Sequence, residues 1–286
     1  MKSIKHSYAV PFTPFLFFAL ILSFGFSACK SKPFPAPETP AVHSASLAYT
    51  GIEAADPDHL SLMFRLESTH SSQAKIESWR AEINGQKAGS ALSLEAAGNS
   101  LPAPLKLSMD MAALEREGLA PFDEYNVKLI IKVNFFSGGE AVIYEVSSIA
   151  SFPGVKAPEF SITSIAVIKA ELINTRFRVN MKIDNPNLFP VSLSSFAYEL
   201  YGNSRLWADG SEKNVFTVPA KSSMTAELYL LMNFINMERS LLDQIIKLVD
   251  VNYRFTGDVQ VSTGLEYLPV FNSGFDLSGY SQVLEK

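Results

Sequence analysis

The chain has 286 residues and carries 24 Lys and Arg against 29 Asp and Glu, a net charge of −5. This acidic balance argues against nucleic acid as a partner, because an acidic surface repels a phosphate backbone. A single cysteine excludes a disulfide within the chain and a cysteine-based metal centre. An apolar content of 47% is enough for a core that needs no disulfides.

The first 28 residues have the three parts of a secretory signal. Lys2 and Lys5 form a basic start, an apolar run extends from 12 to 26, and Ser27-Ala28 follows. The next residue is Cys29, the only cysteine of the chain. Small residues directly before a cysteine resemble the lipobox of bacterial lipoproteins, and that resemblance implies a diacylglycerol on Cys29.

We therefore expect residues 1–28 to be a lipoprotein signal peptide. The mature protein would be lipid-anchored in the bacterial cell envelope, outside the cytoplasm. An ordinary signal peptide and a transmembrane anchor are the alternatives. The anchor is disfavoured because the unbroken apolar stretch covers only 15–22, whereas a membrane span needs about 20 apolar residues.

Residues 29–43 are rich in proline. Four prolines lie between positions 33 and 40, and such spacing favours extended polyproline conformations over packed structure. We expect this segment to be a semi-rigid stalk between the membrane and the folded part.

From residue 44 onward, strand patterns dominate the chain. Apolar residues alternate with polar ones in four segments: 60–66, 125–133, 177–183 and 253–261. Alternation with a period of two predicts strands that bury one face. Turn-prone clusters separate the strands at 84–85, 137–139, 201–203 and 208–210. Many short strands with polar turns predict an all-β sandwich fold.

One segment has helical spacing instead. The apolar residues of 237–249 recur at intervals of three and four, and Asn236 is suited to cap the start. We expect a helix that covers one end of a sandwich. The alternative, a helix on a membrane surface, is disfavoured by its mixed charges, because an anionic bilayer favours basic ones.

The two halves of this region repeat. At an offset of 117 residues, 60–66 falls on 177–183 with the apolar positions in phase. At an offset of 123, Leu107 falls on Leu230, and at 128, Tyr125 falls on Tyr253. We therefore expect two tandem domains, 44–154 and 155–286, with a short helix in the first at 111–116. Two unrelated β domains are the alternative.

The second half resembles the late embryogenesis abundant type 2 domain, also called the water stress and hypersensitive response domain. The resemblance covers roughly 159–277. It rests on Asp184-Asn185-Pro186-Asn187 at a strand end, Leu188-Phe189-Pro190-Val191 after it, the strand 196–201, and Val218–Ser223. It implies an immunoglobulin-like or fibronectin-like β-sandwich with one helix. The first half has Glu67-Ser68-Thr69-His70 in place of the motif, so we treat it as a diverged copy.

The candidate site residues of this half are Asn185, Pro186 and Asn187. Pro186 fixes its own φ and makes the preceding Asn185 extended, while Asn187 tolerates turn geometry and bonds nearby backbone. The trio either shapes a connection between strands or forms a contact surface, and we favour the first hypothesis.

We expect no catalytic residue, no metal site and no cofactor. Nucleophile-elbow, phosphate-loop and dinucleotide motifs do not occur, and His59 and His70 lack partners at metal-ligand spacing. The acidic pairs Asp56/Asp58 and Asp123/Glu124 lie in turn-like sequence, where we expect them to be solvated.

The resemblance implies a non-enzymatic protein that protects the envelope during water or other stress. The partners would be a membrane, through the lipid on Cys29, and client proteins with exposed apolar surfaces. An envelope adaptor and a lipid-binding module that holds an apolar ligand are the alternatives. The oligomeric state stays open.

Overall fold

The chain folds into two tandem β-sandwiches, which confirms the predicted all-β class. A computed structural model describes residues 44–286, apart from 70–72, 138–139, 170–173, 203, 234–249, 283 and 286. The predicted signal peptide, the stalk with Cys29 and the predicted helix at 237–249 lie outside the described residues.

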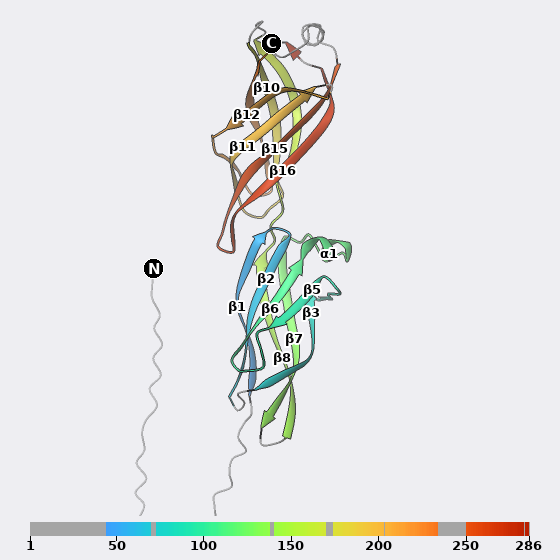
Figure 1. The fold of residues 1–286 in the computed structure, drawn as a ribbon, viewed down its shortest axis with the longest axis vertical. Helices are drawn as coiled ribbons and strands as arrows, with labels where there is room; N and C mark the ends of the chain where they lie inside the picture. Colours follow the sequence, from blue (N-terminus) through green and yellow to red (C-terminus); the bar gives the residue numbers. More distant parts are fainter. Residues whose placement is uncertain are drawn as a thin grey trace, which may run out of the picture. The chain divides into compact units, whose positions relative to one another are not determined.

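The first sandwich consists of two four-stranded antiparallel sheets (Figure 1). One sheet has the order β1 (Ala45–Asp56), β2 (His59–Ser68), β6 (Ala103–Asp110) and β5 (Leu92–Ala96). The other has the order β4 (Gln86–Lys87), β3 (Ala74–Ile83), β7 (Glu124–Ser137) and β8 (Glu140–Pro153).

A short helix connects β6 to β7. It is α1 (Met111–Arg116), with the bounds that the sequence predicts. Asp110 caps its first turn, because the carboxylate accepts a 2.9 Å hydrogen bond from the backbone N–H of Ala113. Leu114 is fully buried and fixes the helix to the sandwich core.

The second sandwich repeats this strand order. Its pairing order is β16 (Leu268–Gln282), β15 (Asp250–Leu265), β11 (Val191–Gly202), β12 (Arg205–Glu212), β14 (Ser222–Asn233), β10 (Asn174–Asn185), β9 (Glu159–Lys169) and β17 (Leu284–Glu285). The short strand β13 (Phe216–Val218) pairs with β11. The strands β12 and β14 pair at Asp209 and Leu231, and this contact joins the two layers of the sandwich.

The strand register reproduces part of the predicted repeat. Ile83 pairs with Val127 in the first sandwich, and Leu200 pairs with Phe255 in the second, at the predicted offsets of 117 and 128. The offset of 123 is wrong by two residues. In the first sandwich Leu62 pairs with Leu107, so the offsets of 117 and 123 together place Val179 opposite Leu230. The structure pairs Val179 with Leu228 instead. A slip of two residues keeps every side chain on the same face, so the apolar pattern cannot detect it.

One predicted turn is also wrong. Residues 208–210 lie inside β12 and not between strands. The glycine that looked like a turn signal, Gly210, makes room for a ring, since a Cβ there would lie 2.5 Å from the ring of Tyr198 on β11. The predicted turn at Asn84-Gly85 is confirmed, and both residues have positive φ.

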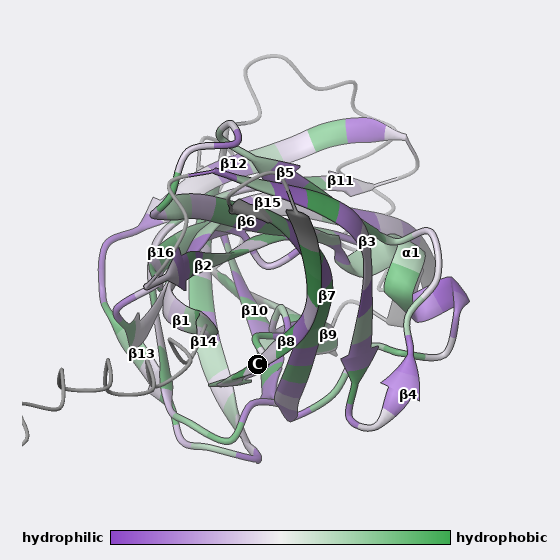
Figure 2. Cartoon of the chain, turned by 90° about the horizontal axis from the view of Figure 1, so that it is seen from below, coloured by the Kyte–Doolittle hydropathy of each residue, from purple (hydrophilic) through white to green (hydrophobic). Residues whose placement is uncertain are grey.

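Each sandwich has its own core of alternating strand residues. Figure 2 shows hydrophobic bands in green and hydrophilic bands in purple along the strands. The largest fully buried side chains include Phe64 and Tyr125 in the first sandwich and Phe177, Phe196 and Phe255 in the second. These large side chains fill the space between the layers, which gives each sandwich its stability.

Aromatic contacts connect the end of β8 to the turn between β15 and β16. Tyr267 in that turn packs against both cores, and its ring lies edge-on to Phe152 with centroids 6.1 Å apart. Its hydroxyl donates a hydrogen bond to the backbone carbonyl of Pro153.

Candidate functional site

The motif turn after β10 is a buried network of hydrogen bonds. Asn185 and Asn187 are each only 2% exposed. The Nδ2 of Asn185 donates to three backbone carbonyls, those of Phe189 (2.8 Å), Val218 (3.2 Å) and Pro219 (3.0 Å). The side chain of Asn185 therefore joins the turn to the segment before β14.

Asn187 bonds to Asn185 and to Lys156, which lies in the linker between β8 and β9. The Oδ1 of Asn185 accepts from the backbone N–H of Asn187 at 3.0 Å and from its Nδ2 at 2.9 Å. The Oδ1 of Asn187 accepts from the backbone N–H of Lys156 at 2.7 Å, and its Nδ2 donates to the carbonyl of Lys156 at 2.9 Å. Both amides are thus engaged inside the protein, and this placement favours the structural hypothesis for the turn.

Charged groups that sequence reasoning missed surround this turn. Asp123, before β7, accepts from the Nζ of Lys156 at 2.7 Å and from the Nζ of Lys221 at 2.8 Å. Lys221 also donates to the carbonyl of Pro186. The expectation that Asp123 is simply solvated is therefore wrong. Its side chain is 40% exposed, but two ammonium groups hold it.

The two lysines lower the pKa of Asp123, first through the hydrogen bond from Lys156 and then through that from Lys221. A carboxylate whose pKa is lower in the folded protein stabilises it above the ordinary value of 3.8. This contribution is lost as the pH falls through the lowered pKa. All three side chains are partly exposed, so we expect the interaction to weaken in salt.

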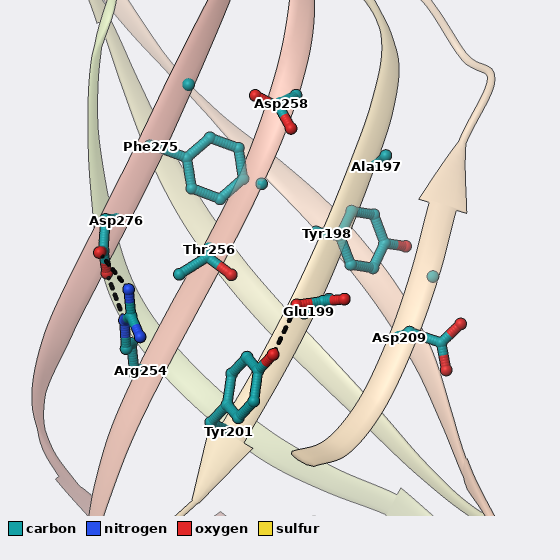
Figure 3. A pocket seen from close by; sticks show the side chains of 13 residues that line it. Ala197, Tyr198, Glu199, Tyr201, Asp209, Arg254, Thr256, Asp258, Phe275 and Asp276 are labelled. Carbon is teal, nitrogen blue, oxygen red and sulfur yellow. Dashed lines mark hydrogen bonds and ion pairs between the residues drawn. The ribbon is translucent and has the colours of Figure 1, made fainter. Parts of the chain in front are cut away.

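A second feature is a groove of 770 Å³ on the outer face of the β12–β11–β15–β16 sheet (Figure 3). Four carboxylates line it: Glu199, Asp209, Asp258 and Asp276. Glu199 and Asp209 are direct cross-strand partners, and like charges in that arrangement are destabilising. The groove therefore has an acidic, solvent-accessible wall.

Ion pairs and hydrogen bonds offset part of this negative charge. Arg254 donates to both oxygens of Asp276, at 2.9 and 2.6 Å, and these bonds lower the pKa of Asp276. The hydroxyl of Tyr201 donates to Glu199 at 2.7 Å, and that bond raises the pKa of Tyr201 (Figure 3). Such a groove can attract cations weakly, but its carboxylates alone do not define a binding site.

Of the other candidate residues, two lie outside the described part of the chain and one is on the surface. Cys29 and His70 lie outside the described residues. His59 is exposed and bonds to Asp56 at 2.9 Å, and Asp56 also accepts from the backbone N–H of Asp58. Among the residues that the structure describes, no three His, Cys, Asp or Glu side chains are grouped closely enough to hold a metal ion. In the same part of the chain, no helix has the length and apolarity to cross a membrane.

The fold and the motif turn together define a tandem β-sandwich protein whose second unit carries an Asn-Pro-Asn turn. Residues 180–274 match the family model described as "Late embryogenesis abundant protein". Over these residues the second sandwich is therefore similar to the late embryogenesis abundant family, the family that the sequence resemblance indicates.

Solved structures offer more distant similarities. A protein from Archaeoglobus fulgidus is 19% identical, with a TM-score of 0.31 over 43% of this chain and 98% of its own. A protein from Arabidopsis thaliana is 15% identical, with a TM-score of 0.35 over 47% of this chain and 86% of its own.

A β-glucuronidase from Bacteroides uniformis is 12% identical, with a TM-score of 0.23. That match covers 81% of this chain but only 26% of the enzyme. No curated protein matches the chain.

Proposed function

We propose that this protein is a non-enzymatic, lipid-anchored envelope protein that protects other proteins during water stress by binding their exposed apolar surfaces. The match of residues 180–274 to the late embryogenesis abundant family supports the link to stress. The surface of the second sandwich supports the mode of binding.

The observation that carries this proposal is a pair of apolar side chains on β14. Tyr229 and Leu231 lie two residues apart on the strand, so both point to the same face, and they are 54% and 53% exposed. The strand residues that point inward, such as Leu228 and Leu230, are buried in the core. Large apolar groups left in solvent beside a filled core favour a protein partner.

An apolar ligand inside a sandwich is less well supported. The inward positions of the described strands carry large side chains with almost no exposure, such as Phe177, Phe196 and Phe255. A lipid between the layers would have to displace them. We therefore favour binding of client proteins at the surface of β14 over binding of a lipid between the layers.

The apolar pair on β14 can be tested by substitution. We expect Tyr229→Ser with Leu231→Ser to raise the protein concentration needed for half-maximal protection of a heat-labile enzyme by roughly fivefold or more. That factor corresponds to the loss of a binding anchor worth about 1 kcal/mol. Residual activity of the enzyme after drying or heating measures the effect.

A matched control exists on β8. Ile143 and Ile149 are each 58% exposed, so Ile143→Ser with Ile149→Ser removes similar apolar area from the first sandwich. We expect this control to protect as the unmodified protein does. Equal loss in both variants, or no loss in either, would contradict a client surface on β14.

The anchor rests on Cys29 and is tested separately. Cys29→Ser removes the sulfur that would carry the lipid, so we expect the protein to move from the detergent phase to the aqueous phase, or to remain uncleaved. Phase partition and mass spectrometry of the N-terminal peptide measure the change. Unchanged partition into detergent would overturn the lipid anchor.

A further inference from the structure

The linker between the sandwiches is held by a side chain in place of a strand. The backbone N–H and carbonyl of Lys156 both bond to the amide of Asn187, at 2.7 and 2.9 Å. An adjacent strand would satisfy the same donor and acceptor pair. Asn187 thus provides the bonding pattern of a β-bridge to Lys156, which lies outside the described strands, three residues before β9 begins.

The side chain of Asn187 cannot rotate toward another partner without losing hydrogen bonds. Its Nδ2 uses both hydrogens, on Lys156 and on Asn185, and its own backbone N–H bonds to Asn185 as well. With 2% exposure, water cannot readily replace these bonds. The backbone N–H of Lys221 also donates to the carbonyl of Asn187 at 3.0 Å. The side-chain amide of Asn187 is therefore held in place by residues of the second sandwich, independently of its bonds to the linker.

An ion-pair cluster adds to the hold on the same residue. The Nζ of Lys156 and the Nζ of Lys221 both bond to Asp123. The linker residue is thus bound at its backbone by Asn187 and at its side chain by Asp123. The two contacts differ in character, because the first is buried and neutral while the second is partly exposed and charged.

In the first sandwich, the described residue that follows β2 also bonds to the residue that precedes β1. Thr69 follows β2, the strand equivalent to β10, and bonds to Ser44, which precedes β1. The backbone N–H of Thr69 donates to the carbonyl of Ser44 at 3.2 Å, and the N–H of Ser44 reaches the Thr69 hydroxyl at 3.5 Å. These contacts are longer than those of Asn187 and lie in exposed positions.

We propose that the Asn-Pro-Asn turn of the second sandwich is a clamp on the chain segment that enters that sandwich. Asn187 holds the backbone of Lys156, and the motif thereby stiffens the linker at residue 156. This role is independent of client binding.

Amide hydrogen exchange in the full-length mature protein tests the tight clamp. We expect Asn187→Ala to speed exchange at the Lys156 amide by about tenfold or more, the factor for one well-placed hydrogen bond. Amides inside β11 and β15 serve as an internal reference and should change less.

Trypsin gives an independent readout, because the Lys156–Ala157 bond is a trypsin site next to the clamp. We expect Asn187→Ala to be cut there at least about tenfold faster at a temperature where the strands remain protected. Asn180→Ala is the matched control. It removes an asparagine of β10 that bonds to Ser164 and does not contact the linker, so cleavage at Lys156 should be unchanged.

A second variant keeps the test usable if Asn187→Ala fails to fold. Lys221→Met leaves the buried amides in place and removes one ion pair to Asp123 and the hydrogen bond to the carbonyl of Pro186, so cleavage at Lys156 should increase less and depend less on salt. Exchange at Lys156 that is unchanged in Asn187→Ala would overturn the clamp. So would an equal acceleration of all amides, since that would make Asn187 a general stabiliser only.

Discussion

Replacing Asn185 with alanine is expected to lower the free energy of unfolding by about 2–4 kcal/mol. The substitution removes the donor for three backbone carbonyls and the acceptor for two N–H groups of Asn187. A buried polar group left without a partner costs about 1–3 kcal/mol, and such costs are only partly additive. The side chain is 2% exposed, so water cannot readily take over these bonds.

Urea unfolding of the full chain, followed by fluorescence and circular dichroism, measures this loss. Asn185→Asp is the informative companion, because it keeps the shape but directs a carboxylate at three carbonyl oxygens. We expect it to be at least as destabilising at neutral pH. Ser192→Ala, which removes an exposed hydroxyl contact to Thr217, should change stability by less than about 0.5 kcal/mol. A stability for Asn185→Ala equal to that of the Ser192 control would contradict the network.

Truncating Phe255 is expected to have an even larger effect, about 3–5 kcal/mol, the usual range for Phe→Ala in a core. Its side chain is fully buried. The ring stacks on Phe275 with centroids 5.4 Å apart and lies against Tyr198 at 5.6 Å. The substitution removes both ring contacts and leaves a cavity that the neighbouring rings cannot close without leaving their own positions.

Thermal and urea unfolding of the variant measure the change. Phe255→Leu retains most of the volume and should cost less than about 1.5 kcal/mol. Tyr280→Ala on β16 is the surface control, since Tyr280 is 81% exposed and should be nearly neutral. If Phe255→Ala cost no more than Phe255→Leu, the second core would be far more loosely packed than its buried side chains indicate.

Local patterns predicted much of the fold correctly. The alternation in 60–66 and 177–183 marks β2 and β10, and the helix at 111–116 has the bounds that the repeat predicts. These features depend on residues a few positions apart, and burial of one face imposes the same period wherever it occurs. Residues 180–274 likewise match the family that the motif and its surrounding strands indicated.

Two errors have a common physical cause. The local pattern predicts a turn at Gly210, but this residue lies in β12, where its missing side chain admits the ring of Tyr198 from the neighbouring strand. The β10–β14 register differs from the prediction by two residues, as Val179 opposite Leu228 shows. In both cases the local structure depends on a partner strand that is distant in the sequence. A local sequence pattern cannot predict which residue of that strand will lie opposite.

The β class, the repeat and the turn-forming character of Asn185, Pro186 and Asn187 follow from the residues and their order alone. The backbone that this turn binds is defined only in the folded protein. Asn187 bonds to Lys156, 31 residues earlier, and Lys221 bonds to Asp123, 98 residues earlier. The turn-forming tendency of Asn and Pro is local and can be read from neighbours in the chain. Which backbone lies within 3 Å of a buried amide depends on how two strand pairs and a linker come together, and no local pattern records that.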